Sequence, residues 1–444
     1  MTISKKILGG MGALGASLIA AAPVWAQEAA AAAPVPDKGD TAFMMVATIL
    51  VLIMIIPGLA LFYGGLVRTK NMLSVMTQVV AVAALAMVLW VIYGYTMSFG
   101  PGGGPIISGF GSLFLAGMTG DSVAATFTDG VVIPEYVFVC FQMTFAAITV
   151  ALVIGGLVER MKFTALMLFA AIWLTIVYFP IAHMVWAANG YLFGLGALDF
   201  AGGTVVHINA GVSALVGCVI LGKRIGYPRE VMAPHSMTMT LIGTGLLWCG
   251  WFGFNAGSAL EANGSAALAM INTFVATAAG ILFWMIAEKL AGHKSSALGA
   301  CSGAIAGLVA VTPAAGNSGP FGAILLGAVA AFVCFYAVSY LKPKLGYDDS
   351  LDAFGIHGIG GIVGSIGTAF TMLPALGGPG AEDYALGSQL WIQLVAVAIA
   401  IAWAAVGSAI AFYVVKAVVG LRVSEEAERE GLDLAEHGER AYNY

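Results

Sequence analysis

Residues 199–224 read DFAGGTVVHINAGVSALVGCVILGKR, a run of apolar and small residues that ends in the cations Lys223 and Arg224. Between Asp199 and Lys223 this run contains no charged residue and a single histidine, His207. About 20 such residues are enough to cross the ~30 Å hydrocarbon core of a bilayer as an α-helix. The run therefore predicts a membrane-spanning helix that carries a histidine below one surface and ends in a basic loop at the other.

Runs of this kind recur along the whole chain of 444 residues, of which 60% are hydrophobic and only 9% are charged. A soluble domain is about a quarter charged. This composition, with a mean hydropathy of +0.95, excludes soluble enzymes, nucleic-acid-binding proteins and disordered regulators. The runs are continuous rather than alternating, which favours helices over a β-barrel. We predict an all-α polytopic membrane protein with 11 transmembrane helices, near residues 41–66, 72–99, 134–158, 163–186, 202–222, 235–258, 265–288, 297–313, 318–341, 352–373 and 388–417.

The positions of the cations predict the orientation of these spans. Of the 18 Lys and Arg residues, two lie in the first six residues and one is Lys38. The other 15 fall after spans 1, 3, 5, 7 and 9 or from the end of span 11 onward, and the intervening loops contain none. Because cytoplasmic loops are enriched in Lys and Arg, we expect the N-terminus outside and the C-terminus inside the cell (N-out, C-in).

The first residues have the pattern of a targeting segment. Lys5 and Lys6 precede an apolar run at 7–21, and the sequence VWA at 24–26 is typical of a cleavage site. Residues 1–26 are therefore predicted to be a signal peptide, with an uncleaved signal anchor as the alternative. The other predicted boundaries are 27–40 for an exported N-terminal tail, 41–420 for the membrane domain and 421–444 for a cytoplasmic C-terminal tail.

Similar stretches surround two histidines and suggest an internal repeat. When His207 is aligned with His357, Gly211 aligns with Gly361. Spans 1–5 and 6–10 would then be the two repeats, and an odd number of helices forces the second to be inverted relative to the first. Transporters with inverted repeats bind their substrate near the midplane, where the repeats meet. The eleventh span has no repeat partner.

Ionisable residues inside spans are costly, so each is a functional candidate. His207 and His357 either form a hydrogen-bonded pair in the core or line a path for a small polar molecule or proton. Asp199 either caps its helix or supplies a fixed negative charge that favours a cation. Asp352 is expected to cap span 10 from the inner side, with an influence on the path as the alternative. Two histidines are too few for a zinc site, so no metal or cofactor is predicted. Residues near span ends are expected to be structural or interfacial anchors; these include His183, His235, Glu159 and Lys342.

Aromatic residues gather in the outer halves of several predicted spans. Phe141, Phe145, Trp186 and Phe254 are either packing or membrane-belt residues, or together form the wall of a vestibule. Such a wall attracts a small cation through its π faces by about 0.5–2 kcal/mol. The hydroxyl of Ser258, in the same region, could accept a proton from that cation.

Several motifs resemble those of the Amt/Mep/Rh family, and of its bacterial ammonium transporters in particular. The resemblance extends from about residue 41 to the end of the chain. The stretch 199–224 resembles the family signature throughout, and Trp186 favours the Amt branch over Rhesus-type relatives. The other matching blocks are FQMTF (141–145), PIAHMVW (180–186), GWFGFNAGS (250–258), GACSGAIAGLVAVTP (299–313), DAFGIHG (352–358) and GLRVSEE (420–426).

This resemblance implies a role for each candidate residue. Trp186, Ser258 and Phe141 correspond to an outer recruitment site for ammonium, and Phe145 and Phe254 to a stacked phenyl gate. His207 and His357 correspond to a twin-histidine pore. Asp199 corresponds to an aspartate that supports the site from below, and Thr312 to a threonine that lines the inner part of the path.

The resemblance also implies the function and the partners. The chain would transport ammonium, or methylammonium as an analogue, across the bacterial inner membrane as a homotrimer with one pore per subunit. NH4+ would lose its proton outside, NH3 would pass the histidines, and reprotonation would follow inside; the sequence leaves open whether the proton is co-translocated. A cytoplasmic PII-type regulatory protein is the implied partner at the inner mouth. The acidic C-terminal tail either is a solvated run or docks on the inner face.

Two other functions are compatible with parts of this pattern. An ammonium sensor would use the same site with little flux, and usually carries an appended signalling domain, whereas only about 25 residues follow span 11 here. An intramembrane enzyme would need a nucleophile or a metal set, and the sequence has no recognisable motif for either.

Overall fold

The computed structural model describes residues 34–443, and those from Pro36 onward form one compact unit. The predicted signal peptide and residues 27–33 of the predicted exported tail lie outside the described residues. Within the described part, the first helix begins at Lys38, where the carboxylate of Asp37 accepts the backbone N–H groups of Gly39 and Asp40.

Eleven helical segments in residues 34–443 are long and apolar enough to cross a membrane, which confirms the predicted number. The largest difference in bounds is at the end of span 4, because a short helix continues that segment to Gly194. The segments are Lys38–Leu66 (α2, Lys38–Ile53; α3, Ala60–Leu66), Thr69–Phe99 (α4, Met72–Leu89; α5, Tyr95–Phe99), Glu135–Gly156 (α6, Glu135–Val153), Phe163–Gly194 (α7, Phe163–Trp173; α8, Phe179–Trp186; α9, Tyr191–Gly194), Gly203–Leu221 (α10, Asn209–Leu221), Met237–Gly257 (α11), Gly264–Leu290 (α12), Ala297–Ala314 (α13, Ala297–Val311), Pro320–Leu345 (α14, Pro320–Tyr336; α15, Lys342–Leu345), Phe354–Thr371 (α16, Ile359–Thr371) and Leu386–Val418 (α17).

One end of the bundle, which we call the C-terminal face, gathers three segments distant in sequence. Arg224, after α10, pairs with Asp348, before α16, and Glu428 of the C-terminal tail accepts the N–H of Ile225. Span 5 therefore ends at this face and span 10 begins there, so the two run in opposite directions. Their first turns are the π-helical segments η7 (Gly203–Ile208) and η10 (Phe354–Gly358), which contain the two histidines.

The two histidine-bearing spans cross at glycines. A Cβ atom added to Gly211 would lie 2.2 Å from the backbone nitrogen of Gly358. A Cβ added to Gly361 would lie 3.0 Å from both the carbonyl oxygen of Gly203 and the Cβ of His207. The absence of side chains at these positions lets the backbones approach closely, as small residues do in other membrane bundles.

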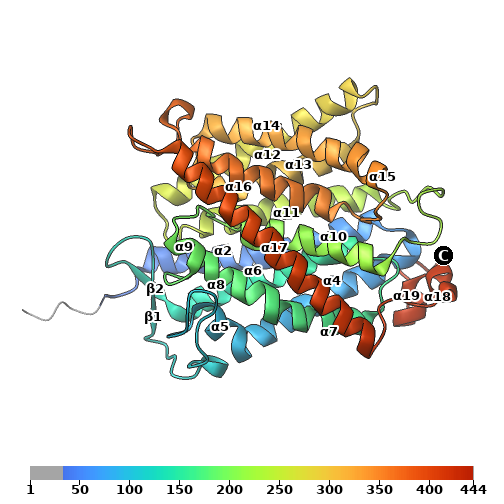
Figure 1. Ribbon diagram of the computed structural model, residues 1–444, viewed down its shortest axis with the longest axis horizontal. Helices are drawn as coiled ribbons and strands as arrows, with labels where there is room; N and C mark the ends of the chain where they lie inside the picture. Colours follow the sequence, from blue (N-terminus) through green and yellow to red (C-terminus); the bar gives the residue numbers. More distant parts are fainter. Residues whose placement is uncertain (1–33, 444) are drawn as a thin grey trace, which may run out of the picture. The chain divides into compact units, whose positions relative to one another are not determined.

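The last span, α17, runs diagonally across α10 and reaches from α16 to α7 (Figure 1). A buried polar group holds it there: the indole Nε1 of Trp173 lies 3.0 Å from the hydroxyl oxygens of both Ser213 and Ser408. In hydrocarbon each polar group needs such a partner, so this contact fixes the register of three spans at once.

Outside the spans, the structure adds elements that the sequence analysis did not predict. Strands β1 (Val123–Ala125) and β2 (Val132–Pro134) pair antiparallel in the long loop before α6, so the described chain is mostly rather than entirely helical. The C-terminal tail folds into two short helices, α18 (Glu425–Glu430) and α19 (Leu432–His437), which lie beside the N-terminal end of α4 (Figure 1).

Candidate functional site

The two histidines lie against each other inside the bundle. The Nδ1 atoms of His207 and His357 are 3.3 Å apart, and their ring centroids are separated by 5.3 Å with an interplanar angle of 22°. Both side chains are buried. Because a contact between two Nδ1 atoms needs one donor and one acceptor, two neutral rings in this arrangement have opposite tautomers.

The first histidine helix begins at a carboxylate. Asp199 accepts the N–H groups of Gly202 and Gly203 through Oδ1, those of Thr204 and Val205 through Oδ2, and the hydroxyl of Thr204. Burial raises the pKa of Asp199, and these hydrogen bonds to the charged form only partly oppose the rise. Its observed contacts are thus those of a helix cap, the first of the two predicted alternatives.

The second histidine helix begins at Asp349, and the prediction that Asp352 caps it is wrong. The carboxylate of Asp349 accepts the N–H groups of Ala353 at 3.1 Å and Phe354 at 2.8 Å. Asp352 instead has a positive φ of 58° and pairs with Lys342. The N–H groups of Ala353 and Phe354 are already taken by Asp349, and the carboxylate of Asp352 is engaged by Lys342.

A stack of aromatic rings adjoins the histidine pair. Phe145 and Phe254 are stacked with centroids 4.2 Å apart and an angle of 18°. Phe141 and Trp186 meet the ring of Phe145 edge to face, at 4.9 and 5.5 Å, and Phe254 lies 6.2 Å from the ring of His207. The structure therefore brings four predicted aromatic residues into one contiguous group that leads to His207.

At the end of this stack away from the histidines, two polar side chains donate hydrogen bonds to backbone carbonyl oxygens. The indole N–H of Trp186 donates to the carbonyl oxygen of Asp199 at 2.9 Å, and the hydroxyl of Ser258 donates to the carbonyl oxygen of Phe254 at 2.9 Å. The ring face of Trp186 and the lone pairs of the Ser258 hydroxyl are the groups that remain. Each suits a small cation that donates hydrogen bonds, the ring through its π face and the hydroxyl oxygen as an acceptor.

Thr312, which the family resemblance assigns to the inner part of the path, is on the segment that follows α13. There the carbonyl of its neighbour Pro313 accepts the N–H of Phe200, next to Asp199. The side chain of Thr312 is fully buried and accepts the indole N–H of Trp251 at 2.9 Å.

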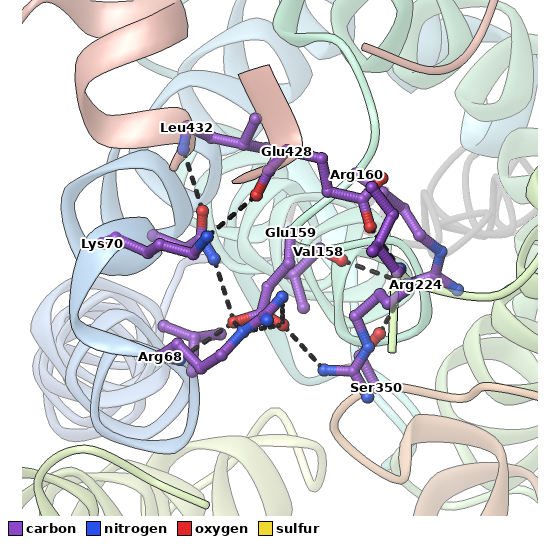
Figure 2. A network of polar contacts seen from close by, with 12 residues as sticks. Arg68, Lys70, Val158, Glu159, Arg160, Arg224, Ser350, Glu428 and Leu432 are labelled. Carbon is purple, nitrogen blue, oxygen red and sulfur yellow. Dashed lines mark hydrogen bonds and ion pairs between the residues drawn. The ribbon is translucent and has the colours of Figure 1, made fainter. Parts of the chain in front are cut away.

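A buried charge network occupies the C-terminal face (Figure 2). Glu159, expected to be an interfacial anchor, is buried and pairs with Arg68 at 2.9 Å and Arg224 at 2.8 Å, and it also accepts from Asn71. Burial alone would raise the pKa of Glu159, but Arg224 and Arg68 outweigh it and lower the pKa to about 2. A fully ionised carboxylate thus joins the loops after spans 1, 3 and 5.

The residue after Glu159 continues this network to another loop. Arg160 is fully buried and donates to the carbonyl oxygens of Gly222 and Asp348 and to the hydroxyl of Ser350. Burial lowers the pKa of Arg160 to about 10 despite the attraction of Asp348. Arg160 therefore remains charged at neutral pH, and its hydrogen bonds hold the residues on both sides of Asp349.

Tail carboxylates meet the starts of two spans at this face. Asp433 Oδ1 accepts the N–H of Ser74 at 2.7 Å, and Glu436 Oε2 accepts the N–H of Phe163 at 2.8 Å. Each is an N-terminal cap supplied from the tail, since these amides belong to the first turns of α4 and α7.

The other histidines considered in the spans are hydrogen-bonded to backbone carbonyl oxygens. The buried ring of His183 contacts the carbonyl oxygens of Ser98 and Gly104, both at 2.8 Å, and His235 contacts that of Val67 at 2.9 Å. Within residues 34–443, no three His, Cys, Asp or Glu side chains come together in a way that could hold a metal ion.

Eleven apolar spans around a buried histidine pair and an aromatic stack define a polytopic membrane protein with a polar and aromatic group inside its helix bundle. The chain belongs to the ammonium transporter family, whose sequence profile matches residues 42–442. It is 46% identical to an ammonium transporter of Bacillus subtilis over 91% of this chain and 99% of the relative. An ammonium transporter of Aquifex aeolicus is also 46% identical, over 92% of this chain and 94% of the relative.

Solved structures agree with this assignment. Mep2 of Saccharomyces cerevisiae superposes with a TM-score of 0.79 at 34% identity and covers 88% of each chain. A protein described as a sensor Amt protein superposes with a TM-score of 0.82 at 27% identity, over 90% of this chain and 98% of the other. The curated relatives carry the names of transporters rather than enzymes.

Two residues that support the histidine helices were not among the candidates predicted from the sequence. Asp349 was overlooked although it lies eight residues before His357, the same separation as between Asp199 and His207. Trp251 was overlooked although it stands inside the GWFGFNAGS motif, next to residues that were chosen. The eight-residue spacing could have identified the first, but no sequence signal indicates that the indole of Trp251 faces a histidine.

Proposed function

We propose that this chain carries ammonium across the membrane by binding NH4+ near Trp186 and Ser258, removing its proton, and conducting NH3 past His207 and His357. The observation that carries the proposal is the continuous series of contacts from Trp186 through the two stacked phenyl rings to the histidine pair. This order places cation-attracting groups first, a dry constriction second and neutral hydrogen-bonding groups last.

Recruitment rests on the hydrogen bonds at the entrance. The hydroxyl proton of Ser258 is used by a backbone carbonyl, so its oxygen acts as an acceptor toward a ligand. NH4+ can donate to that oxygen and rest on the face of Trp186, whereas Na+ and K+ have no proton to donate. This difference supports selection of ammonium over alkali cations.

Deprotonation rests on the cost of burying charge. Phe145 and Phe254, both fully buried, close the way to the histidines with apolar faces only 4.2 Å apart. A charge in such a place is costly, so NH4+ would transfer its proton to water at the entrance, before the phenyl rings, and cross between them as NH3. The rings must move to let it pass.

The histidines supply hydrogen-bonding partners beyond this constriction. Each neutral imidazole offers one donor and one acceptor, and the coupled tautomers of His207 and His357 allow a proton to pass from one ring to the other. Ammonia would be reprotonated on the far side. Whether the released proton also follows through the histidines determines if transport is electrogenic.

The wider arrangement is part of the proposal. The cation distribution favours N-out, C-in insertion, in the bacterial inner membrane, with Trp186 facing outward. The opposed directions and shared Asp-to-His spacing of spans 5 and 10 support an inverted repeat of spans 1–5 and 6–10. A homotrimer, and a PII-type protein at the C-terminal face, are the proposed assembly and partner.

The test is uptake of methylammonium and ammonium-dependent current in proteoliposomes containing wild-type protein or His207→Ala. We expect the wild-type protein to transport and to exclude K+, and the variant to lose that exclusion or most of the flux. Unchanged flux and K+ selectivity in His207→Ala would contradict the proposed role of the histidines. No flux from correctly folded wild-type protein would contradict transport itself.

A sensing role is the second candidate, because one of the structural neighbours is described as a sensor Amt protein. A sensor would bind ammonium at the same site with little or no flux. The same liposome measurement separates the two functions, since ammonium binding without uptake would favour sensing.

A further inference from the structure

The ring of His207 is stacked with two other rings, those of Trp251 and His357. The indole of Trp251 stacks on the imidazole of His207 with centroids 5.4 Å apart and an angle of 22°. The imidazole of His207 also stacks with that of His357, again with an interplanar angle of 22°. Trp251 and His207 are almost completely buried. The plane of His207 is therefore set by a neighbour on α11 as well as by its histidine partner.

Thr312 fixes the indole from behind. Its Oγ1 accepts the N–H of Trp251 at 2.9 Å and lies 2.8 Å from the carbonyl oxygen of Leu308, to which it donates. The same hydroxyl has a longer contact with Asn255 Oδ1, at 3.4 Å, which is a second acceptor for its one proton. With either acceptor, a lone pair of Oγ1 receives the indole N–H. Thr312 is thus a fully buried link between α13 and the indole of Trp251.

We propose that Thr312 is a positioning residue that acts through Trp251 to hold the ring of His207 in the plane needed for its contact with His357. This inference rests on the proposed conduction past the histidine pair. It gives Thr312 a different role from the lining of the path that the sequence suggested.

The physical reason is that the second side-chain torsion of histidine is soft. Torsions of this kind have broad, roughly two-fold preferences, so the backbone of His207 does not fix the ring plane. The contact between the Nδ1 atoms is 3.3 Å long, which is too weak alone to fix it. The indole of Trp251, held by a buried hydrogen bond, can fix the ring plane, because a rotated imidazole would collide with the indole.

A double-mutant cycle tests the proposal. Thr312→Val removes the acceptor at nearly constant volume, and Trp251→Phe removes the donor while keeping an aromatic ring. The readouts are ammonium flux per folded protein and the ratio of K+ to ammonium permeability in proteoliposomes. Thr312→Ser, which keeps the hydroxyl, is the conservative rescue. Thr277→Val is the matched control, because the buried Thr277 also donates to a carbonyl four residues earlier, that of Thr273.

We expect Thr312→Val to slow flux about tenfold, equivalent to about 1.4 kcal/mol, and to raise the permeability ratio, while Thr312→Ser and Thr277→Val stay close to wild type. The double variant should be no slower than Trp251→Phe alone. If the two effects multiply, or if Thr312→Val is silent while wild-type protein transports, the positioning role is wrong although the proposed function stands. If Thr312→Val does not fold, the test uses Trp251→Phe alone and Trp251→Phe combined with Thr312→Ser. A wild-type ratio of K+ to ammonium permeability in both of these variants would overturn the positioning role.

Discussion

Asp199 and Asp349 each lie eight residues before one of the paired histidines, and each carboxylate caps the first turn of that histidine's helix. The two helices enter the bundle in opposite directions, so their capped ends face each other across the histidine pair. A carboxylate at a helix N-terminus is favoured by the helix dipole. The histidine pair is thus supported symmetrically, by one aspartate on each side.

The cap by Asp349 should be more important for stability than the ion pair of Asp352. Asp349→Ala leaves two buried N–H groups without their acceptor, which costs about 0.5–2 kcal/mol. Asp352→Ala breaks a partly exposed pair with Lys342, worth about 0–1 kcal/mol. The measurement is the thermal unfolding midpoint of each purified variant. Equal or greater loss in Asp352→Ala would mean that the cap is not the dominant interaction.

Asp349 should also make stability depend on pH. Burial, followed by the nearby charge of Asp352, raises the pKa of Asp349 to about 6. An acid with a raised folded-state pKa favours folding when protonated, so its contribution is complete below its unfolded value of about 4 and is lost as the pH rises to 6. The stability of Asp349→Asn relative to wild type should therefore fall as the medium is acidified from pH 6 to pH 4. A constant difference across that interval would contradict the raised pKa.

Most of the fold could be predicted from sequence because hydrocarbon imposes a simple rule. An uncharged run such as 202–222 must be helical, and its length alone gives bounds close to those observed for Gly203–Leu221. The π-helical first turns of spans 5 and 10 could not be predicted this way. They depend on caps and close backbone contacts that come from other segments.

The candidate site was predictable where its residues are rare and unpredictable where they are common. His207 and His357 were evident because a histidine within a span is unusual. Glu159 was misplaced, because a carboxylate near the end of a span has the same sequence pattern whether it is solvated or paired with two arginines. Its partners Arg68 and Arg224 are 91 and 65 residues away in sequence, and only the folded chain brings them together.

The helix crossing at Gly211 should not tolerate a methyl group. A Cβ there would lie 2.2 Å from the backbone nitrogen of Gly358, so Gly211→Ala must push the two histidine helices apart. Overpacking of this kind costs about 1–3 kcal/mol, and we expect ammonium flux to be lost as His207 and His357 separate. Gly245→Ala is the control, because a Cβ at that glycine meets nothing within 4 Å. Normal flux in Gly211→Ala would show that the histidine contact is dispensable.

Breaking the buried ion pairs of Glu159 should strongly destabilise the folded protein. Glu159→Gln leaves Arg224, which is also buried, with only Asp348 as a charged partner, and such losses cost about 3–5 kcal/mol. Glu425→Gln, at an exposed position, is the control. Because the pKa of Glu159 is lowered to about 2, its contribution is complete above pH ~4.3 and is lost as the pH falls toward 2. The gap in thermal stability between wild type and variant should therefore close in strong acid, and a gap that persists there would point to packing instead.

The tail should be held in place by the two caps that it supplies. Asp433→Ala combined with Glu436→Ala removes the acceptors for Ser74 and Phe163, each worth about 1 kcal/mol. The tail would then open more often, and trypsin should cleave after Arg429, whose carbonyl oxygen is held by Lys70, about 10- to 30-fold faster if opening and closing are rapid. Glu430→Ala combined with Glu439→Ala removes the same charge from exposed positions and should leave the rate unchanged. Equal acceleration in both double variants would mean that net charge, and not capping, holds the tail on the membrane domain.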